Sequence, residues 1–289
     1  MSLPGDRRGE NALIVANALK DDAVGESKTV ARELKKRGWT TTTFTFEGNP
    51  AGAPPFRDFD FIISLGGDGT LLYVARLAAP LGIPVLPVNL GTLGFIAANR
   101  KDSWHATFDA WQAGTIQSSN RIMLDICVRR RGTCIGSNVA LNDGVVSAQG
   151  ISKMIRLCLS VNGDRFGSYR ADGLIIATPT GSTAYNLAAG GPALFPEMPA
   201  MVINPICPFT LASRPLVLPA SAKVEVSVDE TRRSAAMLTI DGQETLALEM
   251  GDVVQFRRAE HDALLVVPRE TIFFSALRTK LGWSGDGDA

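Results

Sequence analysis

Apolar and polar residues in the first 119 positions follow two alternating patterns. Short apolar runs, such as Ala12 to Val15 and Phe59 to Leu65, predict buried strands. Between them lie stretches with helical spacing, such as Ser27 to Arg37, which ends in basic residues before Gly38. Alternating strands and helices predict an α/β domain with a parallel-type sheet. Further strands are expected over Thr40–Phe46 and Val85–Val88, and helices over the stretch that ends at Ala79 and over Asp102–Ala113.

The pattern changes near residue 119 from helical spacing to a period of two. Leu124, Ile126 and Val128 occupy alternate positions, as in a strand with one buried face. Two later runs of this kind lead into Asn162-Gly163 and Asp241-Gly242, dipeptides that suit tight hairpin turns. This second region is therefore predicted to be β-rich.

These patterns predict two domains. We expect residues 1–119 to form the α/β domain and residues 120–268 to form the β-rich domain. Residues 269–289 return to a mixed, partly helical composition, and we expect this tail to pack on the first domain.

Composition and charge narrow the functional classes. Lys plus Arg and Asp plus Glu both number 29, so no net field attracts nucleic acid or an anionic membrane, and we expect neither as a partner. The four cysteines form no C-x-x-C pair and the chain has two histidines, which argues against structural zinc and against a disulfide framework. We find no targeting segment or membrane span, and so expect a cytoplasmic protein.

Glycine-rich loops follow two predicted strands of the first domain. The strand ending at Leu65 runs into Gly66-Gly67-Asp68-Gly69-Thr70 and then into a helix, and the next strand runs into Asn89 to Phe95. Backbone N–H groups at a glycine loop and a helix N-terminus suit a phosphate, while Asp68 suits a proton acceptor or a site that also holds Mg²⁺. An ordinary strand-to-helix turn capped by Asp68 or Thr70 is an equal alternative.

Polar residues also separate the apolar runs of the β-rich half. Asn142-Asp143-Gly144 and Asp172-Gly173 place carboxylates beside apolar runs, where they suit ribose hydroxyls, although both are common turn sequences. Thr178 to Asn186 carries four hydroxyls besides that of Tyr185 and no charge, and its tyrosine offers a flat face for a base or a ribose. A helix is expected from Ser182 to Ala189.

The chain closely resembles the NAD kinases, in particular the bacterial members, over nearly its whole length. The motifs that carry the resemblance are Gly66 to Thr70, Asn89 to Phe95, Asn142-Asp143, Asp172-Gly173 through Tyr185-Asn186, Asn204 to Pro208, and Ser213-Arg214-Pro215. The glycine motif is shared with lipid kinases and phosphofructokinase-like enzymes, whereas Thr178 to Asn186 makes the match specific.

The resemblance implies transfer of the γ-phosphoryl group of ATP to the 2′-hydroxyl of the adenosine ribose of NAD, which gives NADP. Asp68 then corresponds to the catalytic base, acting directly or through a metal. The other implied NAD- or ATP-binding positions are Gly66, Gly67, Gly69, Thr70, Asn142, Asp143, Lys153, Arg170, Asp172, Thr183, Ala184, Tyr185, Asn186, Leu187, Ala188 and Gln243. Mg²⁺ or another divalent metal is expected to be held mainly by substrate phosphates, with no protein metal site, and a homodimer or homotetramer is expected.

The sequence departs from the NAD kinase pattern at two positions, and two other functions compete with NAD kinase activity. Many members carry Glu at the position of Asp143, and a bulkier residue is common at Gly144. Because Asp is one methylene shorter than Glu, the hydrogen bond that Asp143 accepts from the ligand is expected to be looser or bridged by water. A lipid kinase would need a basic or amphipathic surface that this composition lacks. A nucleotide sensor without turnover would not need the intact Asp68.

Overall fold

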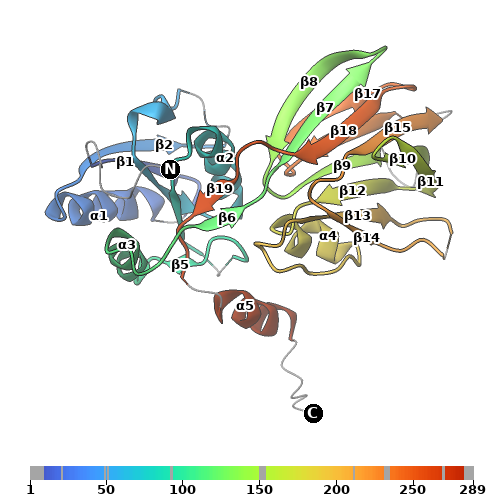
Figure 1. Cartoon of the computed structure of the whole chain (residues 1–289). Helices are drawn as coiled ribbons and strands as arrows, with labels where there is room; N and C mark the ends of the chain where they lie inside the picture. Colours follow the sequence, from blue (N-terminus) through green and yellow to red (C-terminus); the bar gives the residue numbers. More distant parts are fainter. Residues whose placement is uncertain are drawn as a thin grey trace. The chain divides into compact units, whose positions relative to one another are not determined.

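A computed structural model describes residues 10–20, 22–48, 50, 52–91, 94–149, 154–210, 212–230, 235–268 and 271–282. The chain divides into two compact units (Figure 1). The first unit comprises the chain up to Asn120 together with the chain from Ala263 onward, and the second unit comprises Arg121–Asp262.

The first unit is built on a mainly parallel sheet. Its strands are β1 (Asn11–Asn17), β2 (Thr40–Phe46), β3 (Phe61–Gly66), β4 (Val85–Asn89), β5 (Asn99–Arg100), β6 (Ser119–Arg121) and β19 (Ala263–Leu265). Its helices are α1 (Ala23–Lys36), α2 (Asp68–Ala78), α3 (Trp104–Gln112) and α5 (Thr271–Leu281), with 3₁₀ turns η1 (Phe56–Asp58) and η2 (Ala79–Leu81). The order β2-β1-β3-β4-β19-β6 contains parallel pairs from β2 through β19, and β5 also pairs with β4 in parallel. This confirms the predicted α/β architecture.

Helices cover both faces of this sheet, which explains its continuous apolar strands. Ile14 of β1 and Phe61 of β3 lie in one core cluster with Leu34 of α1 and Phe108 of α3. Alternate strand residues point to the other face, which α2 contacts. The carboxyl-terminal helix α5 is part of the first unit, and the ammonium of its Lys280 lies 4.7 Å from the centre of the Phe95 ring. The apolar pattern thus places the ends of β3 and β4 at one edge of a buried sheet.

The second unit is a sandwich of two antiparallel sheets (Figure 1). One sheet has the order β11-β10-β15-β18-β7-β8 and the other has the order β14-β13-β12-β9-β16-β17. The first sheet contains β7 (Leu124–Arg130), β8 (Thr133–Ala140), β10 (Ile155–Val161), β11 (Asp164–Ala171), β15 (Val224–Glu230) and β18 (Val253–Arg258). The second contains β9 (Asp143–Ala148), β12 (Gly173–Ala177), β13 (Ala200–Ile206), β14 (Leu216–Pro219), β16 (Ala236–Ile240) and β17 (Glu244–Leu248). The β-rich prediction is confirmed.

The core of the second unit follows the predicted period of two. Leu124, Ile126 and Val128 of β7 face Val146 of β9 and Leu238 of β16 across the sandwich. Both predicted hairpin dipeptides occupy turns with positive φ: 54° and 90° at Asn162 and Gly163, and 50° and 64° at Asp241 and Gly242. Asn, Asp and Gly are the residues that tolerate this conformation.

The sheet that contains β12 is also covered on its outer face. Ile175 and Ala177 of β12 pack there with Leu194 and Val202. The covering segment holds the 3₁₀ turn η3 (Gly181–Thr183) and the short helix α4 (Tyr185–Ala188), in place of the continuous helix expected from Ser182 to Ala189. The backbone breaks at Ala184, with φ −94° and ψ −128°, and hydrogen bonds from Ser182 and Asn186 to the surrounding loop replace a regular helix.

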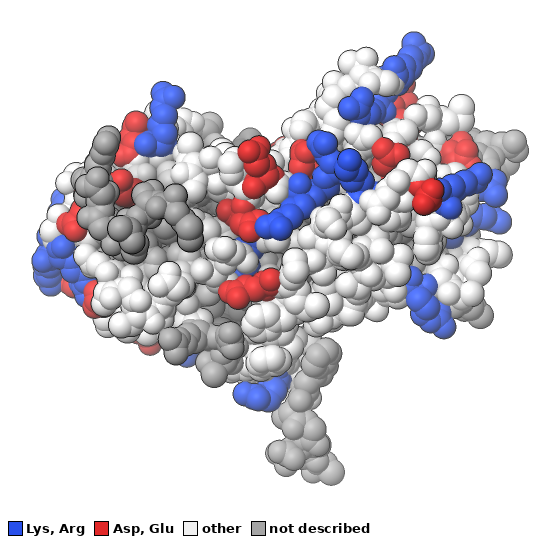
Figure 2. All heavy atoms as spheres, viewed as in Figure 1, with Lys and Arg blue, Asp and Glu red and all other residues white. Residues whose placement is uncertain are grey.

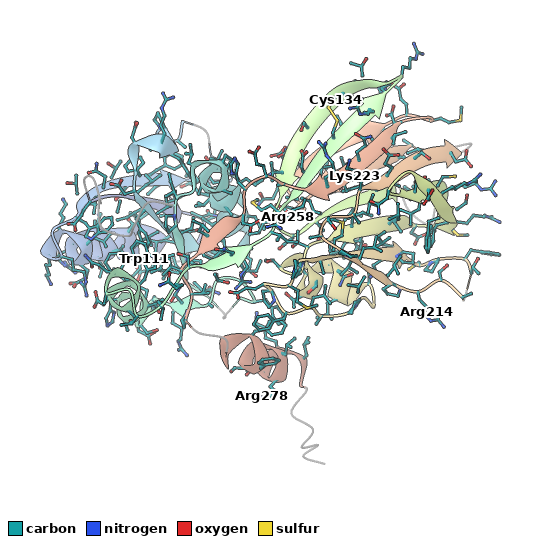
Figure 3. All side chains as sticks on the ribbon, in the orientation of Figure 1. Trp111, Cys134, Arg214, Lys223, Arg258 and Arg278 are labelled. Atoms are coloured by element: carbon teal, nitrogen blue, oxygen red, sulfur yellow. A yellow bond between two sulfur atoms is a disulfide. The ribbon has the colours of Figure 1, made fainter. Side chains whose placement is uncertain are left out.

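A disulfide joins Cys127 of β7 to Cys134 of β8, a residue labelled in Figure 3. The sequence predicted no disulfide framework, and this bridge departs from that expectation. The two strands form a hairpin whose register brings the two Cα atoms to 6.3 Å, and the sequence spacing alone does not reveal this register. Cys158 and Cys207 are free.

Two further observations concern the surface. On the face shown in Figure 2, basic and acidic side chains are interspersed, as the zero net charge leads one to expect. Among the described helices, none combines the length and the apolar character needed to cross a membrane.

Candidate functional site

The glycine loop of the first unit forms the junction between β3 and α2. Gly67 precedes the helix, and Asp68 is its first residue. Packing requires glycine at position 66, because a Cβ there would overlap the buried side chain of Thr70. A helix N-terminus carries partial positive charge and N–H groups, so this junction suits an anionic ligand next to a carboxylate.

The second glycine loop packs directly against the first. The N–H of Leu90 donates to the carbonyl oxygen of Gly66 at 3.2 Å, and the N–H of Ala97 donates to Oδ1 of Asp68 at 3.1 Å. A Cβ on Gly94 would overlap the carboxylate of Asp68. The two loops therefore lie together at the carboxyl ends of β3 and β4, where open α/β sheets bind ligands, and the second loop fixes the orientation of Asp68. Thr92 and Leu93 lie outside the described residues.

A lysine that the sequence did not single out lies beside this loop. Lys20 follows β1, and its Cε lies 3.9 Å from the position that a Cβ on Gly67 would occupy. Its backbone is held by a hydrogen bond from its N–H to the carbonyl oxygen of Asn17 at 3.0 Å. An ammonium group at this position adds positive charge near the N-terminus of α2. Only the pairing of β1 with β3 brings Lys20 to Gly67, so no local signal marks it.

In the second unit, the segment Leu141 to Asp143 is held by two other segments. The hydroxyl of Thr178 donates to the carbonyl oxygen of Leu141 at 2.6 Å, and the N–H of Thr178 donates to that of Asn142 at 2.8 Å. Gly181 lies so close that a Cβ would overlap the backbone of Asn142. From the other side, the carboxylate of Asp241 accepts hydrogen bonds from this segment. The predicted positions Asn142 and Asp143 are thus joined to the Thr178–Asn186 segment and to the hairpin that carries Gln243.

Buried polar atoms without a partner concentrate in the same region. Within the described part of the chain, Oδ1 of Asn142, Oγ1 of Thr180 and Oδ1 of Asn186 are buried and have no hydrogen-bond partner. Buried polar groups are nearly always satisfied in native proteins, and exceptions point to a functional role or a missing partner. These three oxygens therefore support a polar ligand site here.

The Thr178–Asn186 segment contains both structural and accessible residues. Ser182 and Asn186 are fully buried, and the amide of Asn186 donates to the carbonyl oxygens of Ser182 and Pro192 at 2.9 and 3.0 Å. Tyr185 is 48% exposed, so its ring is available to a ligand. Thr183, Ala184 and Leu187 are half-buried and Ala188 is exposed. Asn186 therefore supports the loop, while Tyr185 offers a contact surface.

Asp143 has an unusual protonation equilibrium. Its side chain is 5% exposed, and burial, followed by the charge of Asp241, raises its pKa to about 7. The following Gly144 is enforced by the core, since a Cβ would lie 2.6 Å from the Phe256 ring and 2.8 Å from a methyl of Ile126. Glycine at position 144, where a bulkier residue is common in NAD kinases, is therefore required here because the Phe256 ring fills the space that a side chain would occupy.

Arg170 lies in β11 and Asp172 lies just before β12, next to the end of the β9–β12 ladder that is opposite to Asn142. Ala177 pairs with Asp143, whereas Gly173 pairs with Ser147, about 13 Å away along the strand at 3.3 Å per residue. The guanidinium of Arg170 stacks on Phe209, 4.9 Å from the ring centre. The structure therefore does not bring these two predicted positions to Asn142 along the sheet. Lys153 lies outside the described residues.

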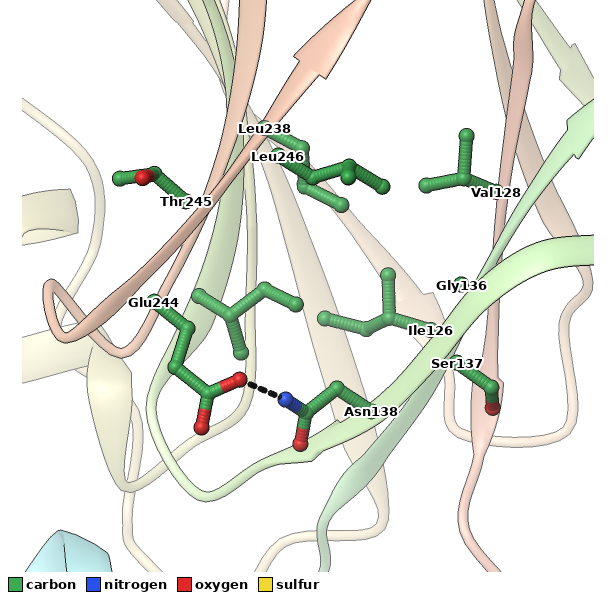
Figure 4. Close-up of a pocket in the computed structure, with 10 residues that line it drawn as sticks. Ile126, Val128, Gly136, Ser137, Asn138, Leu238, Glu244, Thr245 and Leu246 are labelled. Carbon is green, nitrogen blue, oxygen red and sulfur yellow. Dashed lines mark hydrogen bonds between the residues drawn. The ribbon is translucent and has the colours of Figure 1, made fainter.

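A pocket in the second unit holds none of the predicted positions. It is a cavity of about 170 Å³ between the hairpins β7–β8 and β16–β17, lined mainly by apolar residues such as Ile126, Val128 and Leu238 (Figure 4). Asn138 and Glu244 form a hydrogen bond at its edge. None of the candidate site residues lines this cavity, so we do not assign it to the site.

Comparisons with known proteins agree with one another. Residues 52–116 match the family model for the ATP-NAD kinase N-terminal domain, and residues 141–267 match that for the C-terminal domain. An NAD kinase from Treponema denticola is 40% identical over 96% of this chain and 97% of its own length, and one from Citrifermentans bemidjiense is 39% identical over 94% of each.

Solved structures have the same fold. Yeast NADH kinase complexed with NADH superposes with a TM-score of 0.84 and 22% identity, over 96% of this chain and 89% of that one. An NAD kinase from Archaeoglobus fulgidus in complex with ATP superposes with a TM-score of 0.73 and 25% identity, over 92% of this chain and 96% of that one.

Proposed function

Because the chain belongs to the NAD kinase family, we propose that it transfers the γ-phosphoryl group of ATP to the 2′-hydroxyl of the adenosine ribose of NAD. The observation that carries the proposal is the position of the Asp68 carboxylate at the N-terminus of α2. It accepts the N–H of Ala97 and packs against Gly94, where a Cβ would overlap it. In the reaction the hydroxyl oxygen forms a bond to the γ-phosphorus, the bond to the β–γ bridging oxygen breaks, and ADP leaves. Asp68 takes the proton of the hydroxyl.

The residues around Asp68 suit the phosphates of ATP. The N-terminus of α2 that follows Gly67 and the ammonium of Lys20 supply positive potential without covalent chemistry, which is what phosphoryl transfer requires. Mg²⁺ bound to the phosphates would neutralise charge on the transferred group. In the described ranges no three His, Cys, Asp or Glu side chains gather as a metal site. The metal is proposed to be held mainly by the substrate phosphates.

The NAD site is inferred to lie around Asn142 and Asp143. The unpartnered Oδ1 of Asn142 suits an exocyclic amino group of adenine, and the ionised carboxylate of Asp143 suits two ribose hydroxyls. The exposed ring of Tyr185 offers a stacking face. The proposed NAD-binding set is completed by residues of the η3–α4 segment and by one residue of the β16–β17 turn. These are Thr183, Ala184, Leu187, Ala188 and Gln243.

The activity is tested with the purified chain, NAD, ATP and MgCl₂. We expect NADP and ADP to form in equal amounts, and chelation of the metal with EDTA to abolish both products. An NADP-specific dehydrogenase reports NADP, and chromatography reports ADP. Binding of NAD without NADP formation would instead favour a nucleotide sensor, and a lipid acceptor that alone supports ADP formation would favour a lipid kinase.

We also propose a homodimer or homotetramer, in which Arg170 and Asp172 serve the site of a neighbouring copy. The support is their position next to the end of the β9–β12 ladder that is opposite to Asn142. A cytoplasmic location is inferred because the proposed substrates, ATP and NAD, are cytoplasmic metabolites.

Mixing two inactive variants tests the shared site. Asp68→Asn and Asp172→Asn are each expected to have low activity, because the carboxylate at each position is lost. Mixed dimers contain one site with both native residues, so refolding the variants together should restore roughly a quarter of the wild-type activity. Each variant refolded alone is the control for the recovery of activity. Light scattering gives the subunit number. A monomeric protein, or a mixture with no recovery, would contradict the proposal.

A further inference from the structure

Asp241 makes the densest set of contacts to the proposed NAD segment, although the sequence marked it only as a hairpin turn. It lies in the β16–β17 turn at φ 50° and is 7% exposed. Its Oδ2 accepts the N–H of Leu141 at 3.0 Å, and its Oδ1 accepts those of Asn142 and Asp143 at 2.8 and 3.2 Å. Its own N–H donates to the carbonyl oxygen of Asp143 at 2.9 Å. One turn residue thus holds three consecutive residues.

These contacts determine where Asn142 and Asp143 point. Leu141 and Asn142 lie between β8 and β9, where no sheet ladder orients their N–H groups. A carboxylate that accepts three N–H donors replaces the ladder, and charge-assisted hydrogen bonds of this kind are stronger than neutral ones. Since side-chain direction follows backbone orientation, the Asp241 carboxylate fixes the direction of both side chains.

The same carboxylate acts on Asp143 through its charge. Asp143 faces Asp241 across this contact, and that charge adds to burial in raising the pKa of Asp143. The ionised form of Asp143 is the acceptor for ribose hydroxyls, so NAD affinity in the wild type should rise as the pH increases through about 7. Removing the charge of Asp241 should move this midpoint to lower pH.

We propose that Asp241 is a positioning residue for NAD, which orients Asn142 and Asp143 through their backbone N–H groups while not contacting the reacting atoms. This rests on the proposed function. It goes further by assigning the binding geometry to a residue on a different hairpin, 98 positions away from Asp143.

Asp241→Asn and Asp241→Ala test this role. Asparagine has the same size but lacks the charge and turns an NH₂ group toward one N–H donor, and alanine removes every side-chain contact. We expect KM for NAD to rise about tenfold in Asp241→Asn and more in Asp241→Ala, with KM for ATP unchanged within about twofold. Equilibrium NAD binding between pH 5.5 and 8.5, roughly one and a half units on either side of the midpoint, should show the lower midpoint in Asp241→Asn.

Asp252→Asn is the matched control. Asp252 is also a buried turn carboxylate of the second unit, where it accepts the N–H of Glu249 at 2.8 Å and pairs with Arg130 at 2.8 Å. Its substitution should lower Tm and leave KM for NAD unchanged, because it does not touch Leu141 to Asp143.

The outcomes separate the two proposals. A folded Asp241→Asn protein with wild-type KM for NAD and an unshifted pH midpoint would overturn the positioning role while the activity stands. An equal rise in both KM values would also overturn it, as the sign of a general structural effect. If Asp241→Ala does not fold, the positioning role is tested by KM for NAD in Asp241→Asn and by the pH midpoint of NAD binding in Asp241→Asn and in the wild type. Absence of NAD binding and turnover in the wild type would instead overturn the proposed function.

Discussion

Asparagine in place of Asp68 is expected to lower kcat by roughly 10²- to 10⁴-fold, the range that a positioned general base contributes. An amide cannot take the proton of the ribose hydroxyl at neutral pH. Its oxygen can still accept the Ala97 N–H that Asp68 holds at 3.1 Å, so the loop should keep its conformation. The measurements are NADP formation at saturating substrates and calorimetric binding of NAD, whose Kd should change by less than about threefold.

Asp60→Asn is the control for this substitution. Asp60 lies just before the opposite end of β3, where its Oδ2 accepts the N–H of Asn11 at 3.0 Å. It makes a comparable hydrogen bond away from the glycine loops, so kcat should stay within about twofold of the wild type. Full activity in Asp68→Asn would remove Asp68 from the catalytic role. A similar loss in both variants would trace the effect to the sheet rather than to the chemistry.

Alanine in place of Gly181 is expected to lower Tm by roughly 5–10 °C and to weaken NAD binding at least about tenfold. The added Cβ would overlap the carbonyl oxygen, carbonyl carbon and Cα of Asn142, and a backbone moves less readily than a side chain. The strain must separate the Thr178–Gly181 loop from Asn142 or distort both. Thermal unfolding with and without NAD measures the two effects together, since a bound ligand at free concentration L stabilises the folded state by RT ln(1 + L/Kd), so weaker binding gives a smaller rise in Tm.

Gly167→Ala provides the comparison for a glycine of the same unit. Gly167 lies in β11, and a Cβ there would meet no heavy atom within 4 Å. Its Tm should change by less than about 2 °C, with NAD affinity unchanged. A Gly181→Ala protein as stable as Gly167→Ala would mean that the Asn142 segment yields easily, and the proposed rigid NAD site would then be wrong.

Local patterns predicted the architecture because they act over short range. The continuous apolar run of β3 requires burial on both faces, and the glycines after it allow a close strand-to-helix junction. Together they predicted Asp68 in a glycine loop that opens onto a helix. The hydrogen bond from Leu90 to Gly66 confirms that the two loops are neighbours. The period of two after residue 119 likewise predicted a β-rich second unit, whereas its arrangement as two packed antiparallel sheets came from the structure.

The NAD segment shows the limit of such patterns. Asn142-Asp143 was recognisable as a candidate, but such a sequence is more often a turn than a site. Asp241 looked like half of a hairpin dipeptide, and its contact with Asn142 depends on the pairing of β16 with β9. The requirement for Gly144 depends in the same way on Phe256 of β18.

The order of residues alone determined the parallel and antiparallel character of the two units, the turn at Asp241-Gly242 and the carboxylate at the glycine junction. Each of these depends on neighbours within a few positions, through sterics, burial period or hydrogen bonding. Tertiary structure decided which carboxylate accepts the N–H of Asn142, how far Arg170 and Asp172 lie from Asn142, and which cation approaches Gly67. Those features depend on strand register between distant segments, which is set by the packing of the whole core rather than by any one segment.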